Sequence, residues 1–408
     1  MRRVTVLVGF ALLAGLPVTA SACLWDRDTP YHEAIGMSEV VAALTGRFPR
    51  NPPLYYRMRL DRVAAELASK PDDLAAYDDA GVACDRLGLG DEAVAWMEKK
   101  RARLDALDSS RPETREHLYR CHANLGTFLI HRWIRAGADR GRIDEAEAAR
   151  DELAKALEIN PNAHFGREKY QLRAVEWMIA PPQAVGAQWL PNFLNLAPPM
   201  ETTLIDPREA DEMVRGLAGL IVLGNAWESV DVFNALCLAL QHDTLGFDGD
   251  YGGGRNSLAT FAWLRCKQLI EAGKGSLLPD APRGDELLKM IPRPTMLWSE
   301  DLLEPAFQNL RAMADGWQTT RTDFMTARLA EGLHPDVDPD FWDGYKEIGP
   351  PPLPMTSPKK AYEAAFMWRQ RRAKLILVGV ALAFVGSIVG MVLLPRVVRR
   401  LLRGAEPL

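Results

Sequence analysis

The sequence predicts an all-α protein with a single membrane-spanning helix near its C-terminal end. Apolar residues recur at positions i, i+3, i+4 and i+7 through most of the chain, which is the spacing of one helix face. Strand-like runs, in which Val, Ile or Thr alternate with polar residues, do not occur outside the two apolar ends. The run 375–394 has 20 residues and no charged side chain, so as a helix of about 30 Å it would match the hydrocarbon core of a bilayer.

Residues 1–22 have the three parts of a secretory signal peptide. Arg2 and Arg3 precede an apolar stretch, and Ala-Ser-Ala at 20–22 offers the small residues of a cleavage site. An uncleaved anchor is the alternative, although the apolar stretch is short for a span. Cleavage after residue 22 would leave Cys23 at the new N-terminus, as in a bacterial lipoprotein, so Cys23 is a candidate for lipidation. The alternative is ordinary signal-peptide cleavage, which does not require a lipid on Cys23.

The charges that flank the apolar run 375–394 do not give its orientation, because four basic residues precede it and four come after it. The signal peptide decides instead. It predicts an exported body in the bacterial cell envelope, a single-pass anchor and a basic cytoplasmic tail at 395–408. Within the span, Gly386 and Gly390 form a small-xxx-small pair that could support self-association, or could be two of the glycines that are common in spans.

Two proline-rich segments divide the exported body. The connector 180–207 separates a first helical domain (23–179) from a second helical module (208–348), and the apolar residues within the connector predict that it packs across both halves. The linker 349–358 is extended and semi-rigid, and a juxtamembrane helix (359–374) comes after it. The predicted helices are 33–44, 54–69, 73–87, 91–107, 112–136, 144–159, 165–179, 207–223, 227–242, 256–272, 284–290, 300–315 and 320–331.

Residues 72–100 have the pattern of a helical hairpin. Ala80 and Gly81 lie on the apolar face of the first helix, and their small size would let a second helix lie close against it. Ala93 would be the small contact on the returning helix, and Met97 would fill the gap above it. A more degenerate copy comes next and ends with Lys-Ala-Leu-Glu-Ile-Asn-Pro at 155–161.

The stretch 54–179 resembles a tetratricopeptide-repeat array, and the opening residues 23–29 resemble exported repeat proteins of unassigned function. The 45 residues that separate Gly81 from Gly126 exceed the 34 of that family, so extra loop is expected in both hairpins. The resemblance implies an α-solenoid in which the first helices of successive repeats line a groove for peptide segments.

By position, the resemblance implies a partner-binding groove of mixed charge, which would suit a polar or charged peptide. The alternative is that the same side chains form a solvated helix face. The groove residues would be Asp78, Val82, Asp85, Arg86, Arg120, Thr127 and His131.

Nothing in the sequence predicts a metal or a cofactor. His117 and Cys121 share a helix face but His122 lies about 100° round from Cys121, so the three do not converge as a zinc site requires. The loop 248–255 lacks the Gly-Lys-Ser/Thr of a P-loop and the acidic ligands of an EF-hand, so we expect it to be a flexible connector between helices. The alternative is a weak calcium contact through Asp248 and Asp250. The internal cysteines contain no CxxC pair and are expected to be buried, although an oxidising compartment would allow two disulfides; they are Cys84, Cys121, Cys237 and Cys266.

Charge argues against nucleic acid as a partner. The chain has 54 acidic and 49 basic residues, and its basic ends lie outside the predicted exported body, which is therefore more acidic than the whole. We therefore expect a membrane-anchored extracytoplasmic scaffold that binds a protein or peptide partner and is not an enzyme. The alternatives are a hydrolase with its site in the second helical module, near 248–255, and a structural envelope protein that self-associates through its span.

Overall fold

The computed structural model describes residues 40–161, 167–199, 205–242, 254–294 and 300–350, and every element in those ranges is a helix. The predicted all-α class is therefore confirmed. Nearly all of these residues belong to one compact unit, Met1–Leu245 with Arg255–Pro352. Its helices are α2 (Val40–Thr45), α3 (Pro53–Ser69), α4 (Leu74–Arg86), α5 (Gly90–Leu104), α6 (Pro112–Arg135), η1 (Arg140–Arg142), α7 (Ile143–Ile159), α8 (Arg167–Ile179), α9 (Pro207–Val222), η3 (Ala226–Glu228), α10 (Val230–His242), α11 (Gly254–Glu271), α12 (Asp285–Lys289) and α13 (Glu300–Ala330).

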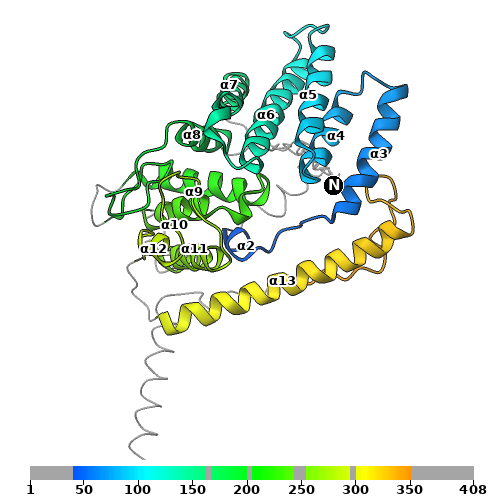
Figure 1. Ribbon diagram of the computed structural model, residues 1–408. Coiled ribbons are helices and arrows are strands. Elements are labelled where there is room, and N and C mark those ends of the chain that lie inside the picture. Colours follow the sequence, from blue (N-terminus) through cyan, green and yellow to red (C-terminus); the bar gives the residue numbers. More distant parts are fainter. Residues whose placement is uncertain (1–39, 162–166, 200–204, 243–253, 295–299, 351–408) are drawn as a thin grey trace, which may run out of the picture. The chain divides into compact units, whose positions relative to one another are not determined.

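From α3 to α10, each α-helix packs against the next one along the chain (Figure 1). Local sequence signals set the starts of several of these helices. Pro53 and Pro112 occupy the first turns of α3 and α6, where a missing N–H costs nothing. Asp73 caps α4 by accepting a hydrogen bond from the backbone N–H of Ala76 at 3.2 Å. The predicted helices of this region are recovered to within a few residues at each end.

Small residues allow the close approach of neighbouring helices, as the sequence predicts. A Cβ atom on Gly81 would lie 2.8 Å from the Phe128 ring and 2.9 Å from the Met97 methyl group. A Cβ atom on Gly126 would lie 2.8 Å from Leu153. These separations are shorter than ordinary van der Waals contacts, so a larger residue at Gly81 would force Phe128 and Met97 to shift, and one at Gly126 would also press on the backbone of α7.

The last long helix differs from the prediction. The two predicted helices 300–315 and 320–331 form the single helix α13, which continues through Gly316. The reason is a continuous apolar stripe that passes the glycine, since Leu310, Ala314 and Trp317 are all buried. Figure 1 shows α13 extending from the region of α11 to that of α3, and it contacts both α2 and α3.

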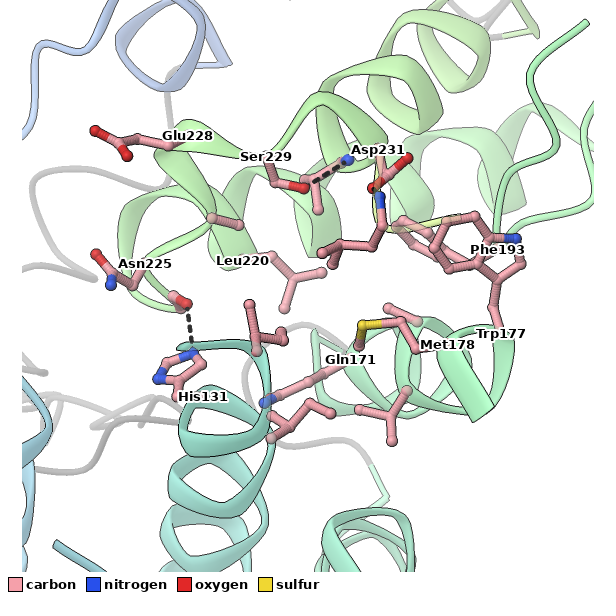
Figure 2. Close-up of a pocket in the computed structure, with 18 of the residues that line it drawn as sticks. His131, Gln171, Trp177, Met178, Phe193, Leu220, Asn225, Glu228, Ser229 and Asp231 are labelled. Atoms are coloured by element: carbon pink, nitrogen blue, oxygen red, sulfur yellow. Dashed lines mark hydrogen bonds between the residues drawn. The ribbon is translucent and has the colours of Figure 1, made fainter. Parts of the chain in front are cut away.

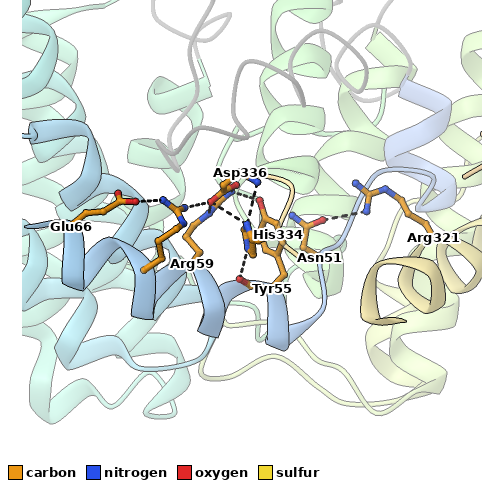
Figure 3. A network of polar contacts seen from close by, with 8 residues as sticks. Asn51, Tyr55, Arg59, Glu66, Arg321, His334 and Asp336 are labelled. Carbon is orange, nitrogen blue, oxygen red and sulfur yellow. Dashed lines mark hydrogen bonds and ion pairs between the residues drawn. The ribbon is translucent and has the colours of Figure 1, made fainter. Parts of the chain in front are cut away.

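A buried polar network, which we call the α3 clasp, joins α3 to the segment after α13 (Figure 3). Its members are Tyr55, Arg59, Arg62, His334 and Asp336. The Asp336 carboxylate accepts hydrogen bonds from Arg59 Nε at 2.8 Å and from Arg59 Nη2 at 2.7 Å, and it also pairs with Arg62. The imidazole of His334 stacks on the Tyr55 ring at 4.6 Å and donates from Nε2 to the Tyr55 carbonyl at 3.0 Å. Burial lowers the pKa of His334.

A second buried carboxylate joins α6 to α7. Glu152 lies 2.6 Å from His122 Nδ1 and accepts a hydrogen bond from Lys155 at 2.9 Å. Burial acts to raise the pKa of Glu152, but these hydrogen bonds hold it at about 2. Because the pKa in the folded chain is below the ordinary value of about 4.3, Glu152 stabilises the fold above that value and its contribution is lost as the pH falls towards 2.

We therefore expect Glu152→Gln to remove part of the acid sensitivity of the chain. The free energy of unfolding of the variant would be lower than that of the wild type near neutral pH. It would also fall less between about pH 5 and about pH 3. Urea denaturation at both pH values measures this difference. Glu147→Gln, an exposed change on the same helix, is the matched control; an acid response of Glu152→Gln equal to that of the control would contradict the assignment.

Several predicted segments lie outside the described residues. They include the signal peptide 1–22, Cys23, the juxtamembrane helix 359–374, the span 375–394 with Gly386 and Gly390, the tail 395–408 and most of the loop 248–255. Among the helices that the structure does describe, none has the length and apolar character needed to cross a bilayer.

Candidate functional site

A pocket of about 370 Å³ opens between α6, α8, the turn from α9 to η3, and the start of α10 (Figure 2). Its walls are mostly apolar. Ile130 and Ile134 come from α6, and Val175 and Met178 come from α8. These pairs are spaced i, i+4 and i, i+3, so each belongs to the apolar face of its helix. The volume lies within the range of about 300–1,000 Å³ that is usual for ligand pockets.

The proline-rich connector supplies part of the wall. Phe193 lines the pocket and packs edge-on against Trp177 of α8, with 6.4 Å between the ring centroids. The backbone N–H of Leu190 donates to the Met290 carbonyl at 2.8 Å, and Asn234 Nδ2 donates to the Leu190 carbonyl at 3.3 Å. The connector therefore contacts helices from both sides of it in the sequence, which confirms the prediction that its apolar residues pack across the two halves.

Charged residues lie at the rim. Figure 2 shows His131, Asn225 and Glu228 at one side of the pocket, and Trp177 and Phe193 at the other. Glu228 forms an ion pair with Lys274 at 2.6 Å. The rim thus carries both signs of charge next to an apolar interior.

Three of the predicted groove residues meet near this rim. His131 Nδ1 lies 3.0 Å from Asp85 Oδ2, and His131 Nε2 lies 3.2 Å from the Gly224 carbonyl. Arg86 Nη2 donates to the Leu223 carbonyl at 2.8 Å. Asp85, Arg86 and His131 therefore join α4 and α6 to the end of α9.

Asp85 also binds Arg135, which lines the pocket. Arg135 Nη1 donates to Asp85 Oδ1 at 2.8 Å, and Arg135 Nη2 donates to the Asp85 carbonyl at 2.9 Å. Burial acts to raise the pKa of the Asp85 carboxyl, but His131 and Arg135 hold it well below its ordinary value. The carboxylate thus fixes the orientation of two pocket residues.

The remaining predicted groove residues lie elsewhere. Asp78 is buried and pairs with Lys100 of α5 at 2.6 Å, and Asn124 Nδ2 donates to it at 3.1 Å. Val82 is buried in the core, and Arg120 pairs with Glu116 one turn earlier at 2.9 Å. Asp78, Val82, Asp85 and Thr127 are all buried, so these four make contacts within the chain in the described structure.

Thr127 orients Gln171, a pocket residue that was not among the predicted groove residues. The Thr127 hydroxyl donates to the Ala123 carbonyl at 2.8 Å, so its proton is already used. Gln171 must then present its NH₂ group to Thr127 Oγ1, at 3.0 Å, and its carbonyl oxygen faces away from that bond. Gln171 Oε1 is buried and has no hydrogen-bond partner in the part of the chain that the structure describes.

A second unpartnered group lies on the same helix. Trp177 Nε1 is buried and, within the described ranges, also has no acceptor. Gln171 and Trp177 are each 8% exposed and both line the pocket. An unpaired polar atom in an apolar site costs about 1–3 kcal/mol, so the pocket favours a ligand that brings both a donor and an acceptor. The signal in the sequence is a polar residue, Gln171, within an apolar stripe that continues at Val175 and Met178.

Asp231 is the remaining acidic residue of the lining. It is buried and accepts hydrogen bonds from the Ser276 hydroxyl at 2.6 Å and from the Leu277 N–H at 2.8 Å. Burial raises the pKa of Asp231 to about 6. These bonds attach the loop after α11 to the start of α10 and so complete one wall of the pocket.

The cysteines and the histidine–cysteine cluster do not form a metal centre in the described ranges. All four internal cysteines are buried as free thiols, which confirms the predicted burial. Cys121 Sγ faces the Met97 carbonyl on α5 at 3.6 Å, whereas His122 faces α7. The described residues contain no group of three His, Cys, Asp or Glu side chains that could hold a metal ion.

Comparison with known proteins does not assign this chain to a family. No protein-family model, no curated protein and no solved structure matches it.

Proposed function

We propose that this protein is a binding scaffold of the tetratricopeptide-repeat type, and that its pocket holds a segment of a partner polypeptide. The observation that carries the proposal is a mostly apolar pocket whose lining includes Gln171, a residue whose carbonyl oxygen has no hydrogen-bond partner in the described structure. A peptide provides the complementary groups, because each residue has a backbone N–H donor and a C=O acceptor beside its side chain. An apolar side chain of the partner would pack against Met178 and Phe193, and an amide would pair with Gln171.

The charges at the rim support a polypeptide rather than a wholly apolar ligand. Arg135 and His131 come from α6, and Glu228 comes from η3, so a bound segment would pass between groups of opposite sign. The successive packing of α3 to α10 gives the rigid support that such a site requires. In this proposal no bond is made or broken, and the protein acts by recognition.

The place of action in the proposal is the cell envelope. The signal peptide at 1–22 and the apolar run 375–394 support an exported body with one membrane anchor. The partner would therefore be an envelope protein, met outside the cytoplasm.

Affinity capture from an envelope extract tests the proposal. Ala174 lines the pocket, so Ala174→Trp would fill it, and Gln171→Leu would remove the carbonyl acceptor. We expect each variant to recover at least about tenfold less of a partner than the wild type does. Gln171→Leu would lose a buried hydrogen bond to the partner, for which about 1.4 kcal/mol is a tenfold change in affinity, and Ala174→Trp would occupy the space that the partner's side chain needs.

Ala148→Trp is the matched control, since Ala148 is an exposed alanine on α7 that does not line the pocket. Helical circular dichroism of all variants checks that they are folded. A photoreactive amino acid placed at position 174 would identify the captured partner directly. Recovery of the same proteins in the same amounts by Ala174→Trp and Ala148→Trp would exclude the pocket as the binding site.

A further inference from the structure

Three arginines surround one tryptophan at a site distinct from the pocket. The guanidinium carbon of Arg265 lies 3.8 Å from the centroid of the Trp227 ring, that of Arg311 lies at 5.1 Å and that of Arg50 at 5.6 Å. Arg265 belongs to α11, Arg311 to α13, and Arg50 to the segment between α2 and α3. We call these four residues the Trp227 cluster. Trp227 does not line the pocket.

The positive charge of the cluster is not balanced by its neighbours. Arg311 pairs with Asp315 at 2.8 Å. Arg265 donates to the Trp227 carbonyl at 3.1 Å and to Gln268 at 3.4 Å, and Arg50 donates to the Gly46 carbonyl at 2.9 Å. Within the described ranges, neither Arg265 nor Arg50 has a carboxylate within ion-pair distance. Glu228, the next acidic group to act on Arg265, is already paired with Lys274. Three guanidinium groups and one carboxylate leave two positive charges.

The arginines are partly desolvated and repel one another. Arg265 is 8% exposed, and burial together with Arg311 lowers its pKa to about 10. Burial and Arg311 also lower the pKa of Arg50. The Nε atoms of Arg265 and Arg311 are buried and have no hydrogen-bond partner in the described part of the chain. Buried cations and unpaired donors of this kind are costly unless an anion joins them.

A glycine and an aromatic ring between α2 and α3 allow the arginines to approach Trp227 closely. Gly46 has φ +78°, and a Cβ atom there would lie 2.5 Å from the Trp227 ring and 2.6 Å from Arg311 Nη1. Phe48 packs edge-on against Trp227 at 5.5 Å and also contacts Arg50, whose guanidinium carbon lies 5.0 Å from the Phe48 centroid. Only glycine at position 46 permits this packing. Trp227 is partly exposed, so the cluster reaches the surface.

We propose that the Trp227 cluster binds a phosphate-class oxyanion. A phosphate group carries a charge of about −1.5 to −2 near neutral pH, which matches the two unbalanced positive charges. A single carboxylate would neutralise only one of these two charges. Guanidinium groups bind such oxygens with paired, charge-assisted hydrogen bonds. The source is either free phosphate or the phosphomonoester of a headgroup, and both present the same tetrahedral oxygens. This site is independent of the proposed peptide pocket.

Calorimetric titration of the full chain in detergent tests the proposal, with inorganic phosphate in one arm and glycerol 3-phosphate in the other. We expect saturable binding of phosphate. Arg50→Gln and Arg265→Gln would each weaken it at least about tenfold, because each removes a charged hydrogen bond of about 1.5–3 kcal/mol. Arg57→Gln, an exposed arginine of α3, is the control and would leave the affinity within about twofold.

The two arms separate the sources. Tighter binding of glycerol 3-phosphate than of inorganic phosphate would assign the site to a headgroup, and the opposite order would assign it to free phosphate. Circular dichroism establishes that each variant is folded, and Arg265→Gln alone is compared with the control if Arg50→Gln does not fold. The proposal is overturned if neither compound binds, if both glutamine variants bind like the control, or if sodium chloride of equal ionic strength gives the same heat.

Discussion

Asp336→Asn is expected to lower the free energy of unfolding by about 3–5 kcal/mol, because it removes the carboxylate that Arg59 and Arg62 of the α3 clasp share. The Asp336 side chain is 2% exposed and that of Arg59 is fully buried. The carboxylate binds two nitrogen atoms of Arg59 and also pairs with Arg62. Without it, the buried Arg59 guanidinium would lose two hydrogen bonds to a carboxylate and would dominate the cost, whereas Arg62 is partly exposed and keeps its ion pair with Glu66 at 2.8 Å.

Urea denaturation followed by circular dichroism measures the effect. Asp340→Asn is the control, since Asp340 is exposed four residues further on and its side chain makes no hydrogen bond that the structure shows; it should change stability by less than about 0.5 kcal/mol. The double variant Arg59→Met/Asp336→Asn should lose less stability than the sum of the losses in the two single variants, since both members of the ion pair are then removed together. If Asp336→Asn lowers the free energy of unfolding by no more than Asp340→Asn does, the α3 clasp does not stabilise the packing of α3.

Periodicity predicted the helices because most of them bury one face along their own length, although α4 and α10 are buried nearly all round. The close contact at Gly81 was foreseen for the same reason, since a small residue in an apolar stripe implies a close neighbour. The break predicted between residues 315 and 320, which begins at Gly316, was wrong. The buried stripe from Leu310 through Trp317 is the stronger signal, and a glycine within a helix costs only about 1 kcal/mol.

The site could not be predicted in the same way, because its contacts join residues that are distant in the sequence. Spacing places Asp85 on a helix face but does not show that His131 and Arg135 will neutralise it there. The Trp227 cluster joins Arg50 to Arg265 and Arg311, which lie more than 200 residues apart from it. The spacing of a charged residue along a helix is the same whether its side chain is exposed or is buried with a partner of opposite charge. Only the packing of neighbouring helices distinguishes the two cases.

Asp78 is an example, because the sequence places it in an exposed groove whereas the structure buries it beside Lys100. This buried ion pair is the basis of the second large expected effect on stability. Lys100→Met is expected to destabilise the chain by about 3–5 kcal/mol, because it leaves the Asp78 carboxylate buried without its cation. Lys100 Nζ contacts both Asp78 oxygens, at 2.8 and 2.6 Å, and both side chains are at most 3% exposed. Burial already raises the pKa of Asp78, and loss of Lys100 would raise it further.

The double variant Asp78→Asn/Lys100→Met is the decisive comparison. Asparagine keeps an oxygen acceptor for Asn124 Nδ2 and carries no charge, so we expect the double variant to regain most of the stability that Lys100→Met loses. The single variant would also be more stable at acidic than at neutral pH relative to the wild type, since a carboxyl whose folded pKa is raised favours the fold while protonated and loses that contribution as the pH rises through it. Thermal unfolding at both pH values measures this. If Lys100→Met is tolerated and shows no such pH response, Asp78 is not held by a buried pair, and its predicted role in a partner-binding groove on α4 regains support.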